Sequence, residues 1–61
     1  MMWFLILWSS IHSPFEGGQY QTKAGCEIAG PIQVHALRSQ YGRLKWACRQ
    51  GDSFEEIVKW D

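Results

Sequence analysis

Two cysteines are the side chains of this sequence with the most distinctive chemistry. Cys26 and Cys48 lie 22 positions apart in a chain of 61 residues that has no other cysteine. A structural zinc site needs ligands at a short local spacing such as C-x-x-C, and neither cysteine has such a neighbour. His12 and His35 do not supply that spacing either. The sequence therefore predicts no bound metal and no cofactor.

The same two cysteines are candidates for a disulfide. Cys26 falls at the edge of the apolar arc of a predicted helix, and Cys48 falls on the inward face of a predicted strand. Packing of the helix on the strand permits the Cα separation of under about 7 Å that a disulfide requires. The alternative is a pair of buried, reduced thiols, as expected in a reducing compartment. Inward-facing thiols are usually inert, and we expect the protein not to be an enzyme.

Charged side chains are segregated along the chain, although six basic and six acidic residues give a net charge of zero. Residues 1–21, 22–51 and 52–61 carry net charges of −1, +4 and −3. Cations with interleaved aromatic residues are candidates for contacts to phosphate, and here they are Arg38, Arg43, Lys45 and Arg49. Alternatively, the acidic tail folds back on this basic segment, which we favour over nucleic-acid binding.

The most apolar segment is Met1 to Ile11. It is predicted to be a strand that is covered on both of its faces, or a strand that contacts a partner. It is shorter than the about 20 apolar residues that span a bilayer. No Lys or Arg precedes Lys23, whereas a secretory signal places cations before its apolar run. A signal or a membrane anchor is the less favoured alternative.

Helical periodicity begins after Thr22, a candidate N-cap. One apolar arc of the wheel, which we expect to face the sheet, contains Cys26, Ile28, Ala29, Ile32, Ala36 and Leu37. Pro31 predicts either a kink or a division into two short helices, and Gly42 predicts the helix end.

Strand periodicity and turn residues define the remaining elements. Pro14 and the Gly17–Gly18 pair predict the turn of a loose hairpin whose second strand is residues 19–21. Residues 44–49 alternate as a strand that ends at Gly51, and Ser53 predicts the cap of a terminal helix, with a last strand as the alternative. The whole chain, residues 1–61, is predicted to be a single α+β domain of ββαβ(α) order, with one amphipathic helix packed on a short sheet.

The segment Thr22 to Gly30 (TKAGCEIAG), with Trp46-Ala47-Cys48 after it and an apolar start before it, resembles a class of very small bacteriophage and bacterial proteins. Proteins of that class run through an apolar strand, a T-K-x-x-C-x-x-A helix and a strand that ends in Cys. The resemblance covers residues 3–49 and implies a phage or bacterial source and a two-cysteine ββαβ core. It supplies no catalytic residues, and Pro31 and residues 51–61 depart from the pattern.

Four tryptophans in so short a chain favour a non-enzymatic interaction or structural protein, such as a phage accessory protein. The expected partner is a larger assembly, a host protein or a second copy of this chain. The candidate partner interface is Trp3, Trp8, Phe54, Ile57 and Trp60, engaged by edge pairing of the first strand or by docking of the last segment. An exported or membrane-associated, disulfide-stapled protein is one alternative, and a weak nucleic-acid binder is another. We expect a location in the host cytoplasm or the virion rather than export.

Overall fold

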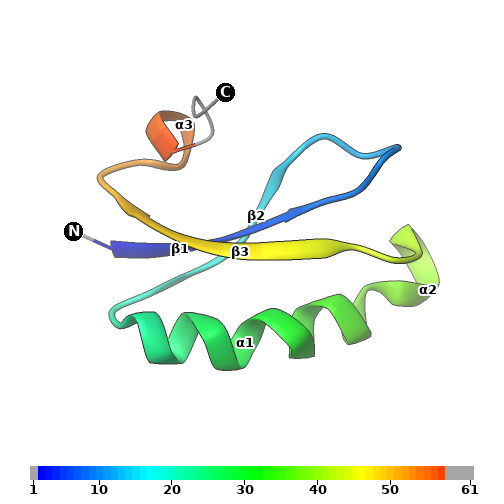
Figure 1. Cartoon of the computed structure of the whole chain (residues 1–61), viewed down its shortest axis with the longest axis horizontal. Coiled ribbons are helices and arrows are strands. Elements are labelled where there is room, and N and C mark those ends of the chain that lie inside the picture. The colour runs from blue at the N-terminus through cyan, green and yellow to red at the C-terminus, as the bar shows by residue number, and fades with distance from the viewer. Residues whose placement is uncertain (1, 58–61) are drawn as a thin grey trace.

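A three-stranded antiparallel sheet forms the centre of the fold in the computed structural model, which describes residues 2–57 (Figure 1). Its strands, β1 (Met2–Trp8), β2 (Phe15–Tyr20) and β3 (Lys45–Gly51), lie in the order β2-β1-β3. The long helix α1 (Lys23–Ala36) runs along one face of the sheet, and the short helix α2 (Arg38–Tyr41) follows it. The short helix α3 (Phe54–Ile57) packs on the other face. The predicted α+β class and ββαβ(α) order are confirmed.

The first strand is the central one and is buried on both faces. Leu5 and Leu7 lie in the core beneath α1, whereas Phe4 and Ile6 pack with Ile57 of α3. Leu5, Ile6 and Leu7 have no exposed surface, which explains why both faces of this strand are apolar. Because β2 and β3 occupy its two edges, β1 has no free edge, and the expectation that a partner strand adds to it is wrong.

The turn between β1 and β2 lies earlier than predicted. Ser9 closes it, because the Ser9 hydroxyl accepts hydrogen bonds from the backbone N–H groups of Ile11 and His12. Gly17 and Gly18 lie inside β2, next to a shift in the pairing register between Leu5 and Ile6 of β1. A Cβ atom at Gly17 would lie only 2.9 Å from Cδ1 of Leu7, so Gly17 makes room for core leucines. A Cβ atom at Gly18 would lie 2.9 Å from the hydroxyl oxygen of Tyr20, so Gly18 makes room for that side chain, and neither glycine forms the turn.

Local signals set the two ends of the helical segment. The hydroxyl of Thr22 accepts a hydrogen bond of 3.1 Å from the backbone N–H of Gly25, as predicted for an N-cap. Helix α1 continues through Pro31, so the division into two helices at that residue is wrong, and the helical path is interrupted instead at Leu37. Gly42 ends α2 with a φ of +74°, which confirms the predicted glycine stop.

The face that α1 turns toward the sheet agrees with the predicted arc only in part. Cys26 is buried, and Ala29 and Leu37 pack against the same core, as predicted. Gly30 is also buried, whereas Ile28, Ile32 and Ala36 are exposed. Gly30 contacts the indole of Trp46 directly, because it has no side chain to hold the helix away from β3. The disulfide and this close approach fix the rotation of the helix about its axis. They therefore decide which side of α1 is buried, and the two isoleucines remain exposed although they belong to the apolar arc.

The C-terminal helix forms as predicted over the residues that the structure describes. The Ser53 hydroxyl accepts a hydrogen bond of 3.3 Å from the backbone N–H of Glu56, which caps α3. Ile57 is buried, and Phe54 packs against the same cluster as a half-buried side chain. The rest of the predicted segment, including Trp60, lies outside the described residues. Within residues 2–57, no helix is both long and apolar enough to cross a membrane.

Candidate functional site

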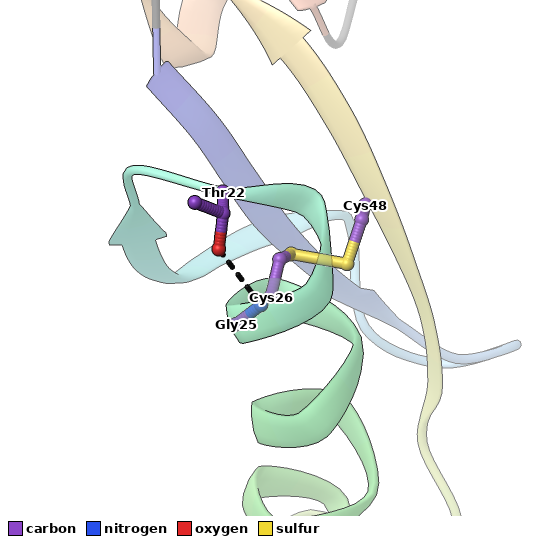
Figure 2. The surroundings of a disulfide bond; sticks show 4 residues. All are labelled: Thr22, Gly25, Cys26 and Cys48. Atoms are coloured by element: carbon purple, nitrogen blue, oxygen red, sulfur yellow. Dashed lines mark hydrogen bonds between the residues drawn. A yellow bond between two sulfur atoms is a disulfide. The ribbon is translucent and has the colours of Figure 1, made fainter.

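A disulfide between Cys26 and Cys48 joins the first turn of α1 to the middle of β3 (Figure 2). The two Cα atoms are 6.1 Å apart, within the normal range for this bond. Cys26 is completely buried, directly after the capped turn of Thr22 and Gly25. Local capping therefore places the sulfur, and the bond fixes the start of the helix against the sheet.

This bond uses both cysteine sulfurs, so neither is a thiolate nucleophile or a metal ligand in the oxidised protein. The ring of His12 packs edge-on against Tyr41, with 5.0 Å between the ring centroids, and His35 lies exposed on α1. Among the described residues, no three His, Cys, Asp or Glu side chains gather closely enough to hold a metal ion.

The most unusual surface of the described chain is the outward side of α1, which we call the α1 outer face. Its members are all exposed and apolar: Ala24, Ile28, Pro31, Ile32 and Ala36. Ile28 and Ile32 leave 67% and 60% of their surface exposed, although isoleucine is among the residues most often buried. Two such side chains on adjacent turns form an apolar patch with no covering element in residues 2–57.

The spacing of this face has the geometry of a helix-packing surface. Four of its residues follow one another at intervals of four, in the order Ala24, Ile28, Ile32 and Ala36. A row of residues at intervals of four forms a ridge that can fit into the groove of another helix. In this row the alanines lie at the two ends and the isoleucines lie in the middle. Glu27 and His35 are also exposed on this helix and supply polar groups beside the apolar row.

The aromatic residues predicted as a partner interface do not form one surface in the structure. Trp3 is half-buried on the α1 side of the sheet, where its ring lies 5.9 Å from the ammonium nitrogen of Lys23. Trp8 and Phe54 are half-buried on the opposite side, where they pack beside the cluster that contains Ile57. Ile57 is itself a core residue with 7% exposure, and Trp60 lies outside the described residues.

The basic residues predicted to contact phosphate are divided between two faces. Arg38 and Arg43 line one shallow hollow beside α2, on the α1 side of the molecule. In β3, Lys45 and Arg49 pair with Trp8 and Phe4, and they therefore point to the side of the sheet that α3 covers in part. Lys45 and Arg49 therefore lie on the opposite face of the sheet from Arg38 and Arg43, the two arginines that precede β3.

The α1 outer face is not predictable from helical periodicity, which places Ile28 and Ile32 on the expected buried arc. The signal that identifies the correct side is the spacing of Cys26 and Gly30, which are one turn apart and face the inward strand residues Trp46 and Cys48. No protein-family model, curated protein or solved structure matches this chain.

Proposed function

We propose that this chain is a non-enzymatic interaction protein that docks on a protein partner through the α1 outer face. The partner is a subunit of a larger assembly, such as a phage particle, or a host protein that presents an apolar helix or groove. The contact surface consists of Ile28 and Ile32 and their apolar neighbours on α1, rather than of the tryptophans expected from the sequence.

The exposure of these two isoleucines is the observation that carries the proposal. Burial of an exposed isoleucine side chain is worth about 1.5–3 kcal/mol, so a side chain left in water on a rigid helix is a source of binding energy. The disulfide and the contact of Gly30 with Trp46 hold the helix in its rotation, so the two side chains cannot turn inward. A partner that covers them binds a preorganised surface, which lowers the entropic cost of association.

Site-specific photo-cross-linking in the native source tests this proposal. A photoreactive residue at position 28 should cross-link to one defined polypeptide, whereas the same residue at the exposed position 55 on α3 should not. A second copy of this chain as the cross-linked species would identify self-association as the function of the face. Equal cross-linking from both positions would overturn the proposal.

A matched pair of variants makes the test quantitative. The double variant Ile28→Gln, Ile32→Gln should weaken capture of the identified polypeptide at least tenfold, because it removes both apolar side chains from the face. Ile11→Gln is the control, since Ile11 is 80% exposed but lies in the turn between β1 and β2. A similar loss in the control variant would show that general surface hydrophobicity, and not this face, causes the binding.

The disulfide favours a second candidate, an exported protein, because disulfides persist mainly in oxidising compartments. Alkylation of the natively isolated protein before any reduction tests this second candidate. Two blocked cysteines that react only after reduction support export or an oxidising assembly. Two freely reacting thiols would remove the support for export.

A further inference from the structure

A shallow hollow of about 340 Å³ opens where α1, α2 and the entrance to β3 meet, on a different part of the molecule from the α1 outer face. Its lining consists of Val34, Arg38, Arg43 and Leu44. The volume is at the lower end of the range for small-molecule sites, about 300–1,000 Å³. The hollow therefore has room for a small ligand rather than for a folded partner.

Two chemical characters meet in this hollow. Leu44 is a core residue with 7% exposure, and Val34 packs against the same cluster, so together they present an apolar wall. Arg38 and Arg43 are both exposed, and no carboxylate among residues 2–57 pairs with either guanidinium. Two unpaired cations at one opening favour an anion that neutralises both, because each guanidinium offers a planar fork of donors.

The fold holds the two arginines at this opening by local structure. Arg38 is the first residue of α2, and its carbonyl oxygen accepts a hydrogen bond from the backbone N–H of Gly42. The positive φ of Gly42 then reverses the chain, so that Arg43 and Leu44 return toward α1 before β3 begins. The two arginines are thus attached to a short, closed turn, which restricts their backbones before any ligand binds.

We propose that this hollow binds a small organic anion, in which Arg38 and Arg43 hold a phosphate or carboxylate group and Val34 and Leu44 contact a compact apolar body. This inference is independent of the proposed protein partner, because the two surfaces share no residue. A ligand that has only the acidic group would leave Val34 and Leu44 without a contact, and a ligand that has only the apolar body would leave the two arginines without a contact.

Nuclear magnetic resonance titration of the full chain tests the site with four probes. Phenyl phosphate and benzoate carry both parts and distinguish a phosphate from a carboxylate, inorganic phosphate carries only the charge, and benzyl alcohol carries only the ring. The better of the two aromatic anions should bind at least tenfold more tightly than inorganic phosphate or benzyl alcohol. The backbone signals of residues 34, 38, 43 and 44 should shift in a saturable manner.

Charge variants then separate a site from general attraction. Arg38→Gln and Arg43→Gln should each weaken binding of the better probe at least tenfold, because each removes one donor fork. Lys45→Gln removes the same charge from a position on the other side of the sheet, and it should change binding less than twofold. Folding of each variant is checked by far-ultraviolet circular dichroism.

Three results would overturn the inference. The first is an equal loss of binding in Lys45→Gln and Arg43→Gln, which would indicate an unspecific positive field. The second is equal affinity for inorganic phosphate and the better aromatic anion, which would show that the apolar wall is not used. The third is the absence of saturable shifts at the residues of the hollow with all four probes.

Discussion

Replacement of Gly30 by alanine tests how α1 is seated on the sheet. Gly30 is buried in the second half of α1, and a Cβ atom built on it would overlap the indole of Trp46. The added carbon would lie 2.8 Å from Cε2 of the ring, and still closer to Cδ2 and Cε3. Nonbonded carbon atoms pack at about 3.5–4.0 Å, so either the ring or the helix must move by roughly 1 Å.

Two opposing effects determine the size of the change. Alanine is a better helix former than glycine, which contributes about 0.5–1 kcal/mol of stability in a helix interior. Overpacking of a filled core costs about 1–3 kcal/mol. The helix cannot move away freely, because Cys26 ties it to β3 one turn earlier. We therefore expect a net loss of about 1.5 kcal/mol, which lowers the melting temperature of a domain of this size by roughly 6–12 °C.

Thermal unfolding monitored by far-ultraviolet circular dichroism measures this loss under oxidising conditions. The matched control repeats Gly30→Ala in a Trp46→Leu background, where the obstructing ring is absent. In that background most of the loss should disappear, because the overlap with the indole is removed. The remaining effects oppose each other, since alanine has the better helix propensity but its Cβ contacts the ring of Pro31, the next residue. A Gly30→Ala protein as stable as the wild type, with Trp46 in place, would refute the direct contact between the helix backbone and the indole.

Four further outcomes follow from the described contacts. Reduction, or replacement of both Cys26 and Cys48 by alanine, should lower stability by about 3 kcal/mol, as expected for closing a loop of this length, and equal melting with and without reductant would contradict it. Thr22→Ala should cost about 1 kcal/mol in chemical denaturation, whereas Thr22→Ser should keep most of the cap. Leu5→Asp should abolish the cooperative unfolding transition, because it places an unpaired charge at a fully buried position. Ile28→Gln should leave the melting temperature within a few degrees of the wild type, and a large drop would show that this side chain belongs to the core.

Much of the fold is predictable because its signals are local. A strand with apolar residues on both faces must be covered on both sides, and β1 is the central strand with a helix on each face. The hydroxyl caps at Thr22 and Ser53 mark the starts of α1 and α3, and Gly42 marks the end of α2. The sequence signal for each of these features is contained in a few neighbouring residues.

The candidate surfaces could not be predicted in the same way, because they depend on which distant groups meet. The wheel of α1 has apolar residues over most of its circumference, so periodicity alone does not select the buried side. The selection comes from Cys48 and Trp46, which lie on β3 and meet Cys26 and Gly30 only in the folded chain. The separation of Lys45 and Arg49 from Arg38 and Arg43 also depends on the fold, because the residue at which β3 begins decides which of its side chains face α1 and which face α3.

The central position of β1 also affects how the chain folds during synthesis. β1 is made before both of its neighbours, and β3 follows it only after more than thirty further residues have been added. Until then the hairpin with β2 is a two-stranded unit, and such a unit is marginally stable on its own. The sheet is therefore completed by the pairing of β1 with β3, which are far apart in the sequence. This late, long-range pairing slows folding and leaves the apolar β1 exposed in the nascent chain. A chaperone that binds extended apolar segments would find its target in β1, and would lose it when β3 pairs.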